Sequence, residues 1–389
     1  MFNIRTYNRI SEKGLGRFDP ENYRLGEDLA DPDAYILRSH KLHGEAVPDS
    51  LLAVARAGAG YNNIPVDDYT HRGIVVFNTP GANANAVKEL VVAGLVLGSR
   101  GVFDGIRYVQ SLGDVSDATD LAKALEREKK RFAGTELAGK KLGIIGLGAI
   151  GSMVANMALE LDMRVAGFDP ALSVEAAWRL SSRVERVESL GALLGEADYL
   201  SLHVPVNEHT RNLIDADAIG RMKPGARLLN FAREEIVDIA AVVEALDAGQ
   251  LARYVTDFPR PELLGREDTV LLPHIGASTR EAEENCAVMA AEQLMDFLEN
   301  GNIVNSVNFP QTRMARNGGH RLTFWNDNVP RVLGAVLAVF ADRNVNVIDL
   351  VNKSHGDVAY NIIDLETPPG PHALEEVGRV EGVIRLRTV

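Results

Sequence analysis

Three side chains of this sequence have the types and positions needed for proton transfer beside an anionic substrate. His274 follows the apolar run 269–272, and histidine is the side chain most often used as a general base. Arg233 ends the run 226–232, where a planar guanidinium can hold a carboxylate through two hydrogen bonds. Glu262, in the loop after Asp257, can reach the imidazole and stabilise its charged form. These residues form a candidate catalytic set for oxidising an alcohol next to a carboxylate.

Other interpretations of these residues stay open. His203 also ends a predicted strand and competes as the base. Glu262 has a second interpretation as a loop acid that faces solvent. Arg233 has a second interpretation as the partner of Glu234 or Glu235. The acid–base interpretation is favoured because the three residues together supply every group that the reaction requires.

The stretch 141–151 organises the region that carries these residues. The apolar run 142–145 predicts a buried strand. Gly146, Gly148 and Gly151 follow with the spacing of a tight turn that lets backbone approach a pyrophosphate. The apolar residues after them recur at helical intervals. Strand, turn and helix in this order predict a dinucleotide site at a helix N-terminus.

Asp169 decides between this interpretation and an ordinary glycine turn in an unrelated α/β domain. It ends the run 164–168, eighteen residues after Gly151, where an acid accepts both ribose hydroxyls of adenosine. Because an acid there repels a 2′-phosphate, NAD is favoured over NADP. The predicted cofactor contacts on this side are Gly146, Gly148, Ala149, Ile150, Gly151, Asp169, His203, Val204 and Pro205.

The remaining pattern places both sets of loops at sheet edges. Six successive strands from 141 to 272 are expected to end at one edge, with the candidate residues in their loops. Residues 1–86 predict a smaller α/β unit whose strands 34–37, 52–55 and 74–77 end in 38–40, 56–60 and 78–83. Ligands gather at such carboxyl edges, so these loops are candidate substrate walls, or simple turns. The charged run 126–131 is expected on a solvated face, or reaching a neighbouring subunit.

Composition limits the class of protein. A chain of 389 residues is expected to fold as two or three domains. The net charge of -13 argues against nucleic acid and against anionic membranes as partners. A single cysteine, Cys286, fits a reducing compartment, and no signal peptide or long apolar run is evident. We therefore expect a cytoplasmic protein without a metal.

The C-terminal part has a different pattern. Residues 310–319 are polar and begin with proline, which predicts a linker after the chain has returned to the first unit through 282–309. Residues 320–389 predict the order strand, helix, two strands, helix, strand of a ferredoxin-like fold. The expected domains are 1–86 with 282–309 for substrate, 87–281 for cofactor, and 320–389.

Taken together, these motifs resemble the D-2-hydroxyacid dehydrogenase family. The resemblance rests on the glycine motif, Asp169, Arg233, the pair Asp257 and Glu262, and Pro-His-Ile-Gly-Ala-Ser-Thr at 273–279. The segments 37–40, 76–80 and 254–259 and the C-terminal unit look like the branch that acts on phosphoglycerate in serine biosynthesis. The resemblance implies a doubly wound (Rossmann) cofactor domain, a flavodoxin-like substrate domain and a C-terminal regulatory ACT domain.

The resemblance also implies roles for particular residues. It makes Arg233, Glu262 and His274 catalytic, and it places Asp257 at the nicotinamide carboxamide, with Ala232 and Gly276 as further cofactor contacts. It implies that the backbone of Ala59 and Gly60 binds the substrate carboxylate, and that Arg38, Ser39 and Asn83 bind its phosphate.

For the ACT domain, the resemblance implies an amino-acid effector such as serine at Asn328 and Asn346. The sequence departs from the serine-sensitive pattern at Asn326, where those enzymes carry histidine, and at Arg331, where they carry glycine. A homodimer or homotetramer is expected. Two rival functions remain open at this point: a reductase of glyoxylate or hydroxypyruvate, and a protein that binds nicotinamide cofactors without turnover.

Overall fold

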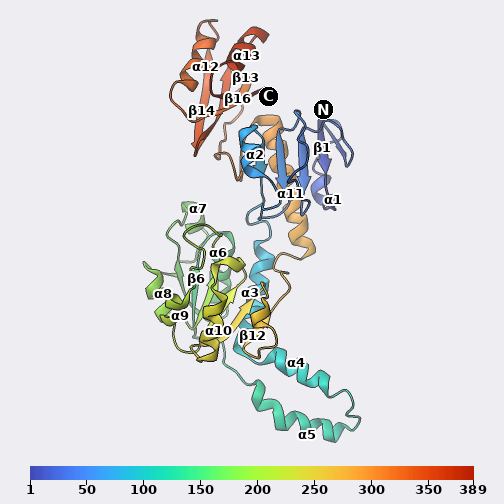
Figure 1. Ribbon diagram of the computed structural model, residues 1–389, viewed down its shortest axis with the longest axis vertical. Coiled ribbons are helices and arrows are strands. Elements are labelled where there is room, and N and C mark those ends of the chain that lie inside the picture. The colour runs from blue at the N-terminus through green and yellow to red at the C-terminus, as the bar shows by residue number, and fades with distance from the viewer. The chain divides into compact units, whose positions relative to one another are not determined.

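The computed structural model describes residues 1–389, except for the side chain of Glu175. Contacts within the chain divide it into two compact units, residues 1–83 with 280–389 and residues 84–279 (Figure 1). No helix among the described residues is both long enough and apolar enough to span a bilayer.

Unit 84–279 contains a seven-stranded parallel sheet in the order β12-β11-β10-β9-β6-β7-β8. This order is that of the doubly wound fold, as predicted. The strands are β6 (Lys141–Ile145), β7 (Arg164–Phe168), β8 (Glu185–Arg186), β9 (Tyr199–Leu202), β10 (Ala226–Asn230), β11 (Leu251–Thr256) and β12 (Thr269–Leu271). The prediction of six successive strands missed β8, because a two-residue edge strand with charged side chains has no apolar run.

Helices cover both faces of this sheet, with a buried core on each side. One core joins α3 (Ala84–Ser99) and α6 (Ala149–Glu160) to the strands. The other core joins α8 (Leu190–Glu196), α9 (Ala216–Gly220) and α10 (Ile239–Asp247) to the opposite face. Short helical turns occupy several loops: α7 (Val174–Ala177), η2 (Glu234–Ile236) and η3 (Pro261–Leu263).

A helical arm projects from this unit between α3 and β6 (Figure 1). It consists of α4 (Val102–Ser111), α5 (Ala118–Glu128) and η1 (Lys129–Phe132). None of the described residues in these three helices is buried. The charged run 126–131 lies on the exposed part of the arm, as predicted.

Unit 1–83 with 280–389 contains a five-stranded parallel sheet in the flavodoxin-like order β2-β1-β3-β4-β5. The strands are β1 (Phe2–Thr6), β2 (Tyr23–Gly26), β3 (Ala34–Leu37), β4 (Ala53–Arg56) and β5 (Val75–Phe77), and the helices are α1 (Glu12–Leu15), α2 (Val66–His71) and α11 (Arg280–Asn300). The segment after α11 contacts this sheet, since Val307 N–H donates to the Val76 carbonyl.

The C-terminal residues form a four-stranded antiparallel sheet in the order β14-β15-β13-β16, with the predicted ferredoxin-like connections. Its elements are β13 (His320–Asp327), α12 (Val332–Ala341), β14 (Val347–His355), β15 (Val358–Leu365), α13 (Pro371–Gly378) and β16 (Val383–Thr388). The two helices share one core with one face of this sheet. On the other face, Trp325 and Tyr360 share a buried core with Phe297 and Phe309.

Arginine side chains join this C-terminal sheet and the segment before it to the end of α11. Their guanidinium groups donate to the last carbonyls of the helix: Arg387 to Phe297 and Leu298, Arg316 to Glu299, and Arg321 to Asn300. Arg321 is also paired with Asp364 at 2.7 Å in the interior. Cations favour the negative end of a helix, so the C-terminal residues complete α11. The predicted linker 310–319 is anchored here, with Thr312 and Met314 buried.

Candidate active site

The glycine turn after β6 leaves space where a phosphate group would approach. Gly146 has φ 88°, and a Cβ atom there would lie 2.6 Å from the His203 carbonyl oxygen. A Cβ atom on Gly151 would lie 1.9 Å from the Gly146 oxygen, so helix and turn are in close contact. A Cβ atom on Gly148 meets nothing within 4 Å. Because α6 starts at the next residue without a side-chain cap, its first N–H groups suit a pyrophosphate.

Asp169 is held against this turn from the neighbouring strand β7. Its carboxylate accepts hydrogen bonds from Leu147 N–H at 2.8 Å and from Ala171 N–H at 2.9 Å. The side chain is partly exposed. A fixed and accessible carboxylate at this position has free acceptor capacity for ribose hydroxyls, so the residues present fit an adenosine dinucleotide.

His203, the rival base, is turned inward beneath the turn. Its Nε2 lies 2.9 Å from Ser201 Oγ, and its Nδ1 is out of reach of solvent without a partner among the described residues. Burial lowers the pKa of His203 to about 3. The Cβ atom of His203 lies 3.4 Å from the Cβ position of Gly151, so its neutral imidazole suits a wall beneath the cofactor better than a general base.

His274 follows β12 in a conformation that side chains rarely adopt. Its φ is 58°, in the left-handed region, which costs a non-glycine residue about 1–2 kcal/mol. The imidazole is exposed, and its ring centroid lies 4.9 Å from that of Phe258. Strain of this kind persists where the surrounding structure enforces it, and it marks functional sites.

Asp257 enforces the turn that carries His274. This carboxylate is buried, with Oδ1 2.8 Å from Ile275 N–H and Oδ2 2.6 Å from Gly276 N–H. The two backbone N–H donors belong to the residues directly after His274, so the Asp257 carboxylate holds this turn in place. Sequence reasoning assigned Asp257 to the cofactor alone and missed this positioning contact, because the two segments belong to different strands.

Arg233 follows β10 and Glu262 follows β11, and β11 lies between β10 and the strand of His274. β10, β11 and β12 are neighbours in the sheet, so their carboxyl ends bring Arg233, Glu262 and His274 to one edge. The exposed Arg233 donates to its neighbour Ala232 O at 2.7 Å. Glu262 Oε2 lies 3.7 Å from Arg260 Nε, and no contact between Glu262 and the His274 imidazole occurs among the described contacts. The catalytic roles of the three residues stay predictions.

The alternative that Arg233 pairs with Glu234 can be checked from the contacts of Glu234. The carboxylate of Glu234 lies 2.6 Å from Arg260 Nη1, so this acid has a partner on a different loop. The side chain of Arg233 is exposed. It remains accessible to a carboxylate ligand.

In the other unit, several side chains fix the loop after β3. The Asn8 side-chain oxygen accepts from the Ser39 and His40 N–H groups. Asn63 donates to the His40 carbonyl, and Arg56 Nε donates to the Arg38 carbonyl at 3.0 Å. The backbone of this loop is thereby held in place. The side chain of Arg38 leaves the loop and lies 2.7 Å from Glu283.

Arg56 is a candidate that sequence reasoning did not select. It ends β4, the strand next to β3, and a Cβ atom on Gly58 would lie 2.6 Å from its Nη1. Its guanidinium therefore lies over the loop that carries Ala59 and Gly60. The signal was present in the sequence, because Arg56 and Arg38 both stand at the ends of predicted strands.

Comparisons with known proteins agree with this geometry. The family model "D-isomer specific 2-hydroxyacid dehydrogenase, NAD binding domain" matches residues 108–276. The D-3-phosphoglycerate dehydrogenase of Escherichia coli K12 is 34% identical, over 96% of this chain and 90% of the relative. The chain belongs to the D-2-hydroxyacid dehydrogenases. It is an NAD-dependent enzyme of this family.

Solved structures show the same fold. An NAD+-bound 3-phosphoglycerate dehydrogenase of Entamoeba histolytica is 26% identical, with a TM-score of 0.60 over 79% of this dehydrogenase and 98% of that chain. A glyoxylate reductase from Paecilomyes thermophila is 24% identical, with a TM-score of 0.65 over 79% and 98% of the two chains. At that identity the second likeness extends to the fold alone.

The candidate effector residues of the dehydrogenase lie in the C-terminal residues 320–389. Asn328 donates to the Gly356 carbonyl at 3.0 Å, and Asn346 is exposed. Asn326, at the position of the family's histidine, is buried and accepts a 2.7 Å hydrogen bond from Asn361. Asn326 therefore serves the interior of the sheet. No cluster of potential metal ligands occurs among the described side chains.

Proposed function

We propose that this dehydrogenase oxidises D-3-phosphoglycerate to 3-phosphohydroxypyruvate, the first step of L-serine biosynthesis. The observation that carries the proposal is the pair of cations, Arg38 and Arg56, at the ends of the neighbouring strands β3 and β4. A phosphorylated hydroxy acid carries one more anionic group than a plain one, and arginine forks bind such groups well. The names of the curated relatives support the same substrate.

In the proposed reaction, the alcohol carbon C2 loses a hydride and its hydroxyl loses a proton. His274 takes the hydroxyl proton, and Glu262 stabilises the imidazolium that results. Arg233 holds the C1 carboxylate and polarises the forming carbonyl. NAD, held by the turn at Gly146–Gly151 and by Asp169, supplies the hydride acceptor when bound.

On the substrate side, Arg38, Ser39 and Asn83 take the phosphate. Asn83 immediately precedes α3, so the first N–H groups of that helix add favourable donors for an anion. The backbone of Ala59 and Gly60 takes the carboxylate. In this arrangement the two ends of a three-carbon acid have separate anchors.

Comparing 3-phosphohydroxypyruvate with hydroxypyruvate in the NADH-dependent reduction, each with and without serine, tests the proposal. The proposed function requires kcat/KM to be much higher for the phosphorylated acid. A preference for hydroxypyruvate or glyoxylate would instead assign the chain as a reductase of plain keto acids. Failure of every keto acid to oxidise NADH would support a binding protein.

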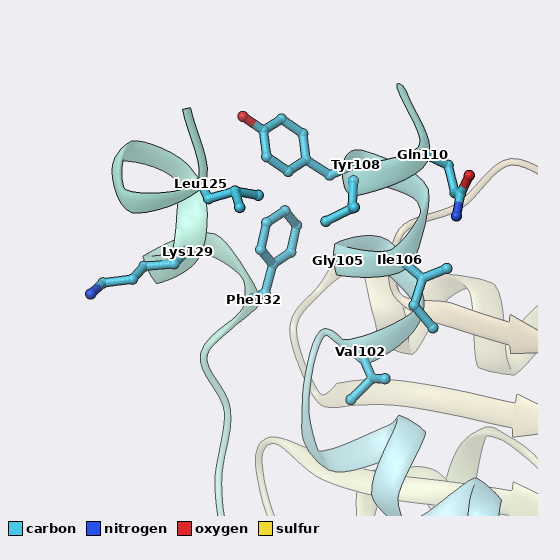
Figure 2. Close-up of a pocket in the computed structure, with 9 residues that line it drawn as sticks. Val102, Gly105, Ile106, Tyr108, Gln110, Leu125, Lys129 and Phe132 are labelled. Atoms are coloured by element: carbon cyan, nitrogen blue, oxygen red, sulfur yellow. The ribbon is translucent and has the colours of Figure 1, made fainter. Parts of the chain in front are cut away.

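We also infer that two copies associate through the helical arm. Phe103, Ile106 and Val109 of α4 expose 45%, 55% and 49% of their surface, which is unusual for large apolar residues. An apolar hollow of about 410 Å³ lies between α4, α5 and η1, as Figure 2 shows. A second copy would cover this face and give a homodimer, or a homotetramer if the C-terminal units also pair. Ile106→Glu is expected to yield monomers in sedimentation experiments.

Asn328 and Asn346 would bind an amino-acid effector, with serine as the first candidate. Serine titration of the wild type and of Asn346→Ala tests this assignment, and inhibition that is equal in both would contradict it. We further infer that the enzyme works in the cytoplasm, where cell fractionation should find it.

A further inference from the structure

Arg38, the proposed phosphate ligand, already has an acidic partner within its own unit. Its Nη1 lies 2.7 Å from Glu283 Oε1, and the two side chains are 41% and 45% exposed. Glu283 stands in the first turn of α11, and the loop of Arg38 follows β3. Two elements far apart in the sequence therefore meet in this ion pair.

The neighbouring acid on α11 has other partners, so Glu283 is the acid that pairs with Arg38. Glu284, the next residue on α11, pairs with Lys13 and with Arg280. The Arg38 carbonyl is bonded to Arg56 Nε, so the backbone of the loop stays fixed while the Arg38 side chain can change partner. An exposed ion pair of this kind is weak, so an incoming anion can replace it.

A phosphate group at Arg38 would need the N–H donors that Glu283 now uses. It would also lie beside the displaced carboxylate, and like charges at such separations repel. Free phosphate would have to overcome both effects with its contacts at this one site. A phosphorylated acid has its carboxylate as a second anchor, which offsets the same penalty.

We propose that Glu283 is a specificity-determining residue that competes with phosphate for Arg38. It weakens by the same factor the binding of every ligand that places a phosphate at Arg38, and it leaves ligands without such a phosphate unaffected. Its consequence is that inorganic phosphate alone inhibits the enzyme poorly. This inference rests on the proposed function, since it assumes that Arg38 receives the substrate phosphate.

The test uses Glu283→Gln in the full chain, with Glu284→Gln as the matched control from the same helical turn. The probes are inorganic phosphate as a competitive inhibitor and the KM values for 3-phosphohydroxypyruvate and hydroxypyruvate. We expect the inhibition constant of phosphate and the KM of the phosphorylated acid to fall about two- to fivefold in Glu283→Gln. The KM of hydroxypyruvate should stay constant, and the control should match the wild type. The effect should shrink as salt is added.

A double variant tests whether Glu283 acts through Arg38. In an Arg38→Gln background, Glu283→Gln should no longer change the inhibition constant of phosphate. Weaker phosphate binding in Glu283→Gln, an equal change for both keto acids, or an effect that persists without Arg38 would each overturn the inference. A wild type that shows no preference for the phosphorylated acid would overturn the proposed function instead, whereas the phosphate inhibition constants still report on Glu283.

Discussion

The carboxyl edges of the two parallel sheets differ in how their polar groups are held. At the edge of the seven-stranded sheet, the glycine turn offers backbone N–H donors, His203 is bonded to Ser201, and Asp257 is bonded to two backbone N–H groups, while Arg233 and His274 are exposed. At the edge of the five-stranded sheet, Arg38 and Glu283 are partly exposed ions paired with each other.

This difference matches what each edge has to bind. Buried polar groups that are held by backbone hydrogen bonds, as Asp257 is, form a rigid surface, and such a surface suits a cofactor that is the same in every cycle. Exposed ion pairs are easily broken, so their side chains can change partners when a charged substrate arrives. Changes at the first edge should therefore affect every substrate, and changes at Arg38 or Glu283 of the second edge should affect phosphorylated ones.

The largest effect is expected from His274→Ala at the first edge. Removing the base should lower kcat by about 10²–10⁴-fold for phosphorylated and plain keto acids alike, while NADH binding stays near normal. Steady-state rates and fluorescence titration with NADH measure the two effects. His209→Ala is the matched control, because His209 is an exposed histidine of the same unit. Turnover within a few fold of the wild type would remove His274 from the mechanism.

Arg38→Gln at the second edge should change only one class of substrate. Loss of a charged hydrogen-bonding partner should raise KM for 3-phosphohydroxypyruvate by about 10–100-fold and leave hydroxypyruvate nearly unchanged. The control is Arg17→Gln, another exposed arginine of this unit that pairs with Glu292. An equal loss for both acids would contradict the contrast between the two edges.

The neutral His203 predicts how the first edge responds to acid. Its pKa is about 3 in the folded chain and 6.5 without burial. Between these values the unfolded chain binds a proton that the folded chain does not. The stability from this residue is therefore complete above pH 6.5 and is lost as the pH falls toward 3. As the pH falls through this range, His203 alone should raise the unfolding constant by at most about tenfold per pH unit.

Urea unfolding between pH 7 and pH 4 measures this dependence. His203→Gln should lower the slope of stability against pH by up to one proton, and His209→Gln should not. Parallel curves for the wild type and His203→Gln would show that the imidazole is protonated in the folded enzyme.

Asp169→Ala should produce the smallest of these effects. Without the carboxylate, NAD loses its ribose contact and NADP loses a repulsive neighbour, so the preference for NAD should fall about 5–50-fold. Kinetics with both cofactors give the ratio, and Asp217→Ala serves as an exposed control on the same unit. An unchanged ratio would reject the ribose assignment.

The sequence predicted the parts of the molecule that depend on local spacing. The glycine turn, Asp169 and the strands around them were found because short apolar runs and fixed intervals are local signals. The first two strands of the chain were missed: β1 (Phe2–Thr6) alternates apolar and polar residues, and β2 is a short edge strand. The C-terminal ferredoxin-like order was found because its strands alternate clearly with apolar helices.

Contacts between distant segments were beyond reach. The bonds from Asp257 to the residues after His274, and the pair of Arg38 with Glu283, depend on how separate strands and helices pack. The left-handed backbone at His274 likewise has no local signature, since the neighbouring Pro273 and Gly276 suggest only a turn. Residue types showed which chemistry is present, and packing shows which groups are already engaged.

The packing of the C-terminal sheet against α11 limits how the enzyme can be truncated. A chain cut after Phe309 would look like a complete two-domain dehydrogenase in the sequence. Yet such a fragment would lose the donors to the final carbonyls of α11 and would leave Phe297 and Phe309 facing water in place of Trp325. The C-terminal portion therefore supports the fold of the neighbouring helix α11, and its removal should lower solubility before it reveals anything about control.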